Sequence, residues 1–175
     1  LCRWTASLAA AAGLPVSEKE VQIKTPDGTC DAFFAHPSTG QHPGVLIWTD
    51  AFGLRPAFRD MAKRLAAEGY AVLIPNPFYR TAKALATDKP DSPHLLVPKI
   101  NANYLIAIAD NDDKQDPAAK DTLREAFKSA KKPAEIEVYS GANHGWCVPG
   151  SAVYNEPAAE KAWAKLLALY KTALA

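Results

Sequence analysis

Two continuous apolar runs on either side of an amphipathic segment constrain the fold of this chain most strongly. Residues 44–50 (GVLIWTD) and 70–75 (YAVLIP) are typical of strands buried on both faces, because their apolar runs do not alternate with polar residues. Between them, Pro56 suits a first helical turn and Gly69 marks a helix end. Apolar side chains keep helical spacing in this interval: Phe58, Met61, Ala62, Leu65 and Ala66. A strand, a helix and a strand in this order predict a parallel sheet.

Further strands and helices are predicted before and after this strand–helix–strand unit in the sequence. Runs 21–24 and 30–35, separated by Asp27-Gly28, predict an antiparallel hairpin. Residues 104–109 (YLIAIA) and 136–139 predict two more strands. Helices are expected to open at two places, Pro117 and Glu156. The prediction is an α/β fold with a mostly parallel sheet flanked by helices and an antiparallel N-terminal hairpin.

The domain organisation follows from length and periodicity. We expect one domain over residues 16–175, preceded by an N-terminal extension at 1–15, with the tail of a cleaved leader (LAAAAGL) as the alternative reading of the extension. Residues 79–103 carry three prolines and no sustained period, which predicts a structureless connection. A connection of that length is uncommon inside a compact domain.

Charge and composition restrict the partners. Twenty basic and nineteen acidic residues give a net charge of +1 without a basic cluster, so nucleic acid is not an expected partner. No apolar run reaches membrane-spanning length, so no membrane partner is expected either. Three irregularly spaced cysteines favour a reducing compartment, and we expect a cytoplasmic protein. These features do not specify an oligomeric state.

Polar residues follow three predicted strands, where open α/β sheets carry their reactive groups. The stretches are 49–50 (TD), 110–113 (DNDD) and 140–146 (SGANHGW). An acid on one strand end and a histidine on the next match the second half of a nucleophile–acid–base triad, in which the carboxylate orients the imidazole. His144 is the candidate base. Asp112 is the preferred acid, with Asp113 as the alternative.

Other readings of these residues are less favoured. A calcium loop would need glycine where Gln115 stands, so no metal is expected at the acidic run. Asp116 is expected to cap the helix that Pro117 opens. Cys147 is a poor substitute nucleophile, because it lies on a predicted loop rather than at a strand–helix turn.

Three longer motifs resemble the dienelactone hydrolase family. They are VLIWTDAFGLRPAFRDMAKRLAAEGYAVLIPNPFYR, the histidine loop YSGANHGW and the opening hairpin DGTCDAFFAHP. The resemblance covers residues 17–80 and 95–175 and implies an α/β-hydrolase fold. It also implies hydrolysis of a small carboxylic ester or lactone through an acyl-enzyme on a Cys or Ser nucleophile, without a cofactor.

The resemblance also implies roles for individual residues. His144 matches the base and Asp112 its orienting acid. Asp50 takes the place of the acidic residue, usually Glu in this family, that holds the resting nucleophile. The Ala51 backbone N–H matches half of the oxyanion hole. Three further positions match substrate-binding residues: Arg80, Phe52 and Trp146.

One departure from the family is large. No Gly-x-Cys-x-Gly or Gly-x-Ser-x-Gly motif occurs in the 175 residues. The family places this nucleophile turn, with two central strands, between the fourth strand and the acid strand, so we predict a deletion or gap near residues 81–87. The expected function is therefore a carboxylic ester hydrolase whose nucleophile lies outside these residues. The alternative is a catalytically inactive, truncated homologue with a binding or structural role.

Overall fold

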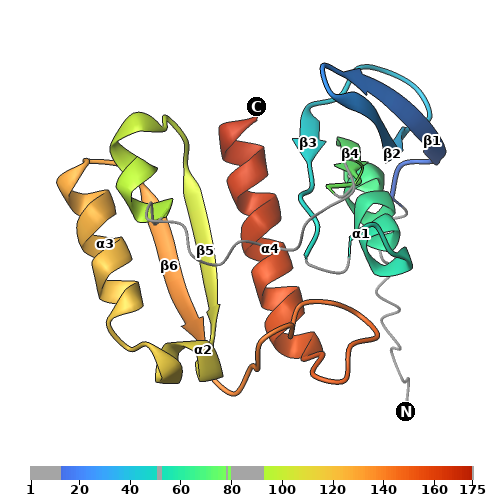
Figure 1. Ribbon diagram of the computed structural model, residues 1–175. Coiled ribbons are helices and arrows are strands. Elements are labelled where there is room, and N and C mark those ends of the chain that lie inside the picture. The colour runs from blue at the N-terminus through green and yellow to red at the C-terminus, as the bar shows by residue number, and fades with distance from the viewer. Residues whose placement is uncertain (1–12, 51–52, 78, 80–92, 175) are drawn as a thin grey trace, which may run out of the picture. The chain divides into compact units, whose positions relative to one another are not determined.

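A computed structural model describes residues 13–50, 53–77, 79 and 93–174 (Figure 1). The chain divides into two compact units, Leu1–Leu85 and Ala86–Ala175. Each unit contains its own sheet. The boundary between the two units lies between residues 85 and 86.

The first unit is a four-stranded sheet with strand order β1-β2-β4-β3. Its elements are β1 (Val16–Thr25), β2 (Gly28–Pro37), β3 (Gly44–Leu46), α1 (Pro56–Ala67) and β4 (Ala71–Pro75). β2 pairs antiparallel with both β1 and β4, whereas β3 and β4 are parallel. The hairpin and the strand–helix–strand unit are therefore both confirmed. The turn lies one residue earlier than expected, at Pro26-Asp27, because Gly28 already pairs with Thr25 as the first residue of β2.

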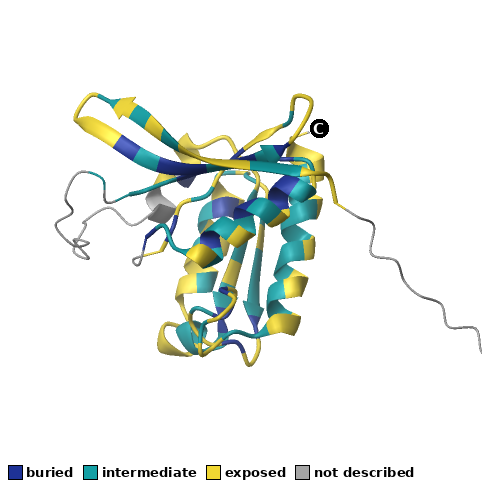
Figure 2. Cartoon of the chain, turned by 90° about the vertical axis from the view of Figure 1, so that its right-hand side faces the viewer, coloured by how far each residue is buried: buried dark blue, intermediate teal, exposed yellow. Residues whose placement is uncertain are grey.

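The core of the first unit lies between α1 and the middle of the sheet. The helix packs on β2 and β4. Its buried face carries Phe58, Ala62, Leu65 and Ala66, all of which fit the predicted helical spacing. The sheet contributes fully buried side chains at Ala32, Ala35, Val72 and Ile74. Figure 2 shows that this buried band gives way to exposed residues at the tip of the hairpin.

Strand β3 is shorter and more exposed than the apolar run 44–50 predicts. It ends at Leu46, and one further bond joins the Ile47 N–H to the Leu73 carbonyl at 2.9 Å. Leu46 is 60% exposed and Trp48 is 68% exposed. A continuous apolar run indicates a strand covered by neighbours on both sides, but β3 pairs only with β4 within the described residues. The expectation of a buried strand over residues 44–50 is therefore wrong beyond Val45, and β3 is the last strand of its sheet among the described residues.

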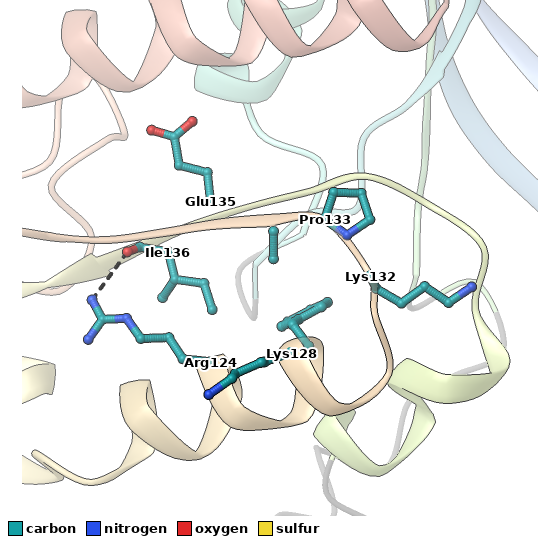
Figure 3. Close-up of a pocket in the computed structure, with 8 residues that line it drawn as sticks. Arg124, Lys128, Lys132, Pro133, Glu135 and Ile136 are labelled. Carbon is teal, nitrogen blue, oxygen red and sulfur yellow. Dashed lines mark hydrogen bonds between the residues drawn. The ribbon is translucent and has the colours of Figure 1, made fainter.

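The second unit is built on a parallel pair, β5 (Tyr104–Ala109) and β6 (Ala134–Tyr139). Its helical elements are η1 (Pro93–Lys99), α2 (Asp110–Gln115), α3 (Ala119–Ser129) and α4 (Glu156–Ala173). Helices α3 and α4 lie on opposite sides of the strand pair, as Figures 1 and 3 both show. No helix within the described ranges is both long enough and apolar enough to cross a lipid bilayer.

Two local expectations in the second unit are corrected. The connection 79–103 is not structureless throughout, because residues 93–99 form a 3-10 turn that packs on α3 and buries Val97. Helix α3 begins at Ala119 rather than Pro117, and no side chain caps it. Asp116 instead ends the short helix α2, donating its N–H to the Asp112 carbonyl at 3.1 Å. The acidic run forms a helix of its own, and this shifts the start of the next one.

Candidate active site

The parallel register of β5 and β6 brings Asp112 and His144 together. Ala109 and Tyr139 are paired at the carboxyl ends of the two strands, so the residues after them leave from the same sheet edge. His144 Nδ1 lies 2.8 Å from Asp112 Oδ2, which confirms the predicted hydrogen bond. Because a carboxylate only accepts hydrogen bonds, Nδ1 carries the proton and Nε2 is left as an acceptor.

The histidine loop is held by the residues directly before Asp112. The Gly141 N–H donates to Asp110 Oδ2 at 3.2 Å, and the Asp110 N–H donates to the Ala142 carbonyl at 2.8 Å. The His144 N–H donates to Asn111 Oδ1 at 2.8 Å. Three successive residues of α2 therefore fix the loop backbone and the imidazole together.

Two of these residues, Asp110 and Asn111, were missed as site residues from the sequence. The signal that points to them is the placement of short hydrogen-bonding side chains directly after a strand, where they reach neighbouring backbone groups. The hydrogen bond from Lys114 and then the Gly141 N–H hold the pKa of the Asp110 carboxyl below its usual value, against a small opposing effect of burial. The carboxylate that accepts the Gly141 N–H therefore keeps its charge to lower pH than an unperturbed aspartate would.

The backbone conformation on either side of His144 explains why glycine occupies positions 141 and 145. Gly141 has φ +74° and Gly145 has φ +89°, a region in which side chains are strained. A Cβ atom on Gly145 would lie 3.5 Å from Val153 Cγ2, whereas Gly141 faces open space. Backbone conformation, rather than crowding, therefore explains the Gly-x-x-His-Gly pattern.

Trp146 lies in the core beneath the loop. It is 5% exposed, and its ring stacks on Tyr139 with centroids 4.6 Å apart. The pair packs with Ala109 and Ala142 against three alanines of α4, which are Ala158, Ala159 and Ala162. The Trp146 N–H also donates to the Asn143 carbonyl at 2.9 Å. This position does not support the expected contact with substrate, and the structure gives Trp146 the role of supporting the histidine loop.

Asp113 has a different partner from its neighbour. Lys120 Nζ lies 2.7 Å from Asp113 Oδ1 and 3.0 Å from Oδ2, and the Asp113 side chain is only 19% exposed. Lys120 of α3 holds Asp113 in an ion pair. Asp113 is turned away from His144, so Asp112 alone of the two contacts the imidazole.

The pair lies at the surface of its unit, and the imidazole is the more exposed of the two groups. The His144 side chain is 80% exposed and that of Asp112 is 39% exposed. An exposed contact of this kind adds little to stability. Its consequence is orientation, since it fixes the ring tautomer while leaving Nε2 accessible.

The remaining predicted residues belong to the first unit. Asp50 follows the apolar run that begins with β3 and forms an ion pair with Arg55, the residue that precedes α1. Both side chains are about one third exposed. Ala51, Phe52 and Arg80 lie outside the described residues. Within the described part of the chain, His144 and Asp112 are thus the predicted residues that the structure brings into contact.

Comparison with known proteins gives a consistent family signal. The model of the dienelactone hydrolase family matches this chain in two stretches, residues 30–91 and 86–174. A carboxymethylenebutenolidase of Rhodococcus opacus is 38% identical over 65 residues, which is 36% of this chain and 25% of that protein. A Salmonella typhi protein assigned as a carboxymethylenebutenolidase is 31% identical over 108 residues, covering 51% of this chain and 39% of that protein. The chain thus spans between a quarter and two fifths of these relatives.

Solved structures share the fold. A Klebsiella pneumoniae protein assigned as a dienelactone hydrolase superimposes with a TM-score of 0.79 at 19% identity, over 89% of this chain and 98% of that one. The dienelactone hydrolase-like promiscuous phosphotriesterase P91, from metagenomic libraries, superimposes with a TM-score of 0.69 at 14% identity, over 91% and 99% of the two chains. These likenesses confirm the α/β-hydrolase architecture expected from the sequence.

Proposed function

The chain belongs to the dienelactone hydrolase family, and from this premise we propose that it is part of an enzyme that hydrolyses a carboxylic ester or a lactone. The observation that carries the proposal is the hydrogen bond between His144 Nδ1 and Asp112 Oδ2 at the carboxyl ends of two parallel strands. This arrangement leaves Nε2 ready to accept a proton, which is what acyl transfer requires of its base.

The proposed reaction has two steps. The nucleophile gives its proton to His144 Nε2 and attacks the ester carbonyl, and the alcohol leaves with that proton while an acyl-enzyme forms. In the second step His144 takes a proton from water, the resulting hydroxide attacks the acyl group, and the acid is released as the nucleophile regains its proton. For a lactone the alcohol and the acid remain in one molecule. Asp112 keeps the imidazole in the required tautomer and stabilises its charged form.

The other roles are proposed from the family resemblance. Asp50 would hold the resting nucleophile, the Ala51 N–H would donate to the oxyanion, and Arg80 and Phe52 would contact substrate. The nucleophile itself is proposed to lie on a family segment that is absent from these residues near 81–87. The family match in two stretches supports this proposal, as does the lack of a Gly-x-Cys/Ser-x-Gly motif.

Site-directed variants test the proposed function in a form that carries the family's nucleophile segment near residues 81–87. We expect this form to hydrolyse a p-nitrophenyl ester or an enol lactone. His144→Ala should lower kcat/KM by several orders of magnitude, and Asp112→Asn by about 10²- to 10⁴-fold, because each removes part of the proton-transfer unit.

Asp113→Asn is the matched control, since Asp113 is bound to Lys120 and should leave the rate nearly unchanged. Retention of most of the rate by His144→Ala would contradict the base assignment. Absence of any ester or lactone hydrolysis in the restored form would contradict the reaction class.

A further inference from the structure

A cavity of about 550 Å³, broadly open to solvent, lies between α3 and the beginning of β6, at residues that the proposed reaction does not use. Its volume is within the range of small-molecule sites, about 300–1,000 Å³. It is lined by Arg124, Phe127, Lys128, Lys132, Pro133, Ala134, Glu135 and Ile136 (Figure 3). We propose that this α3–β6 cavity binds a small organic acid, with its carboxylate on Lys128 and its apolar body against the uncharged lining.

The uncharged part of the lining includes a buried aromatic side chain. Phe127 is 4% exposed, and its ring lies 4.6 Å from that of Tyr104 on β5. Pro133 directly precedes β6, and Ala134 and Ile136 lie on that strand; all three add further apolar surface. A flat apolar body placed here would exchange contact with water for contact with these side chains.

Three cationic side chains border the cavity, and they differ in how many hydrogen-bond acceptors they already contact. Arg124 Nη1 donates to Asp121 at 3.0 Å, while Nη2 reaches the Ile136 carbonyl at 3.4 Å. Lys132 Nζ donates to Asn101 Oδ1 at 3.3 Å. Among the contacts of the described residues, the Lys128 ammonium has no acceptor. Lys128 is therefore the cation best able to receive an anion, with Arg124 beside it (Figure 3).

The one acid in the lining does not neutralise these charges. Glu135 is bound by Lys165 of α4. Figure 3 shows its side chain on the opposite side of β6 from Arg124 and Lys128. The face of the cavity next to α3 is thus positively charged over an apolar floor. A ligand with one negative charge and an apolar body matches both properties, whereas a neutral or purely inorganic ligand matches only one of them.

The cavity is separate from the candidate active site. Ala134–Ile136 begin β6, whereas the histidine loop follows its last residue, Tyr139. Five strand steps separate the two ends, which corresponds to about 16 Å. Occupation of the cavity by an acid is therefore a property beyond the proposed hydrolysis.

A titration of the 175-residue chain with benzoate tests the proposal, using backbone amide NMR shifts as the measurement. We expect saturable shifts confined to α3 and the start of β6, with affinity falling as salt is added. Benzamide, which has the same body without the charge, and inorganic phosphate, which has charge without the body, should each bind at least about fivefold more weakly. Equal binding of either, or benzoate shifts spread evenly over the chain, would overturn the proposal.

Two variants locate the site. Lys128→Ala should weaken benzoate binding about tenfold, the effect of losing one charge-assisted contact. Ala134→Met should also weaken it, by filling the space for the apolar body. Lys171→Ala on α4 is the matched control, because it removes an exposed lysine that does not line the cavity. Unchanged affinity in Lys128→Ala, or an equal loss in Lys171→Ala, would show non-specific attraction and refute the site.

Discussion

At the scale of single residues, the position of the candidate base His144 depends on Asn111, a residue that neither donates nor accepts protons in the proposed reaction. Asn111 accepts the His144 N–H at 2.8 Å, and Asp112 accepts the Nδ1 proton at the same distance. Because Asn111 and Asp112 are adjacent on α2, the backbone and ring of His144 are held by one short segment. Asn111 thus acts as a positioning residue for the imidazole.

We predict that Asn111→Ala will loosen the histidine loop without unfolding the unit. A lost neutral hydrogen bond costs about 0.5–1.5 kcal/mol, so the His144 amide should exchange with solvent roughly threefold to tenfold faster, and the preference for the Nδ1–H tautomer should weaken. Hydrogen exchange and imidazole ¹⁵N shifts measure the two effects. Asn111→Asp keeps the acceptor and should restore both, and Asn143→Ala on the same loop is the control. Unaltered exchange in Asn111→Ala would argue against this positioning role.

At the scale of elements, ion pairs hold α4 against β6, in addition to the packing of Ala158, Ala159 and Ala162. Lys161 and Lys165 both bind Glu137, and Lys165 also binds Glu135. The hydrogen bonds from Lys161 and Lys165 lower the pKa of the Glu137 carboxyl from 4.5 to about 2. The hydrogen bonds of Lys165 with Glu135 and then with Glu137 raise the pKa of the Lys165 ammonium. The ionised carboxylate is therefore the form that stabilises the folded unit.

This predicts a defined pH window for the contribution of Glu137. Since its pKa is lower in the folded state, its stabilisation is fully present above about pH 4.5 and is lost as the pH falls towards 2. Thermal unfolding should show wild type more stable than Glu137→Gln at pH 6, with the gap closing at pH 2.5. Glu125→Gln on α3 should show no comparable trend. A gap that stays constant with pH would contradict the linkage.

At the scale of the whole molecule, the proposed proton-transfer pair, Asp112 and His144, needs a nucleophile that the sequence motifs do not provide. The 175 residues contain no nucleophile turn of the family type, and the edge strand β3 exposes Leu46 and Trp48. An attacking residue needs a sharp strand–helix turn beside the oxyanion donors. Both observations fit the proposal that the nucleophile lies on a family segment outside these residues.

We predict that the 175-residue chain forms no covalent adduct with an esterase-directed phosphonate or a thiol-directed lactone probe at the site. A form with the family segment restored should label once per chain, as intact mass spectrometry would record. The mass of the protein isolated from its source gives a second check, with a value several kDa above 18.8 kDa expected if residues are missing from this sequence. Stoichiometric labelling of the 175-residue chain at Cys147 or Ser140 would instead indicate a rewired site.

Much of the local structure was predictable from the residues. The hairpin, α1, β5 and the histidine loop follow from turn chemistry, helical spacing and glycine positions, which act over a few neighbouring residues. The partner of His144 was predicted correctly as Asp112, with Asp113 as the alternative. What the residues did not indicate is the partner of Asp113, because Lys120 lies seven residues further along the chain.

The amino-acid sequence by itself determined most of the strands and the longer helices, that the chain is of the α/β class, and that an acid and a histidine follow neighbouring strands. Tertiary structure alone decided that β3 is an exposed edge, that Trp146 supports the loop, and that Asp110 and Asn111 clamp it. The physical reason is that the spacing of apolar residues indicates which side chains of a segment are buried. The residues that cover those side chains are distant in the sequence, so the spacing does not identify them.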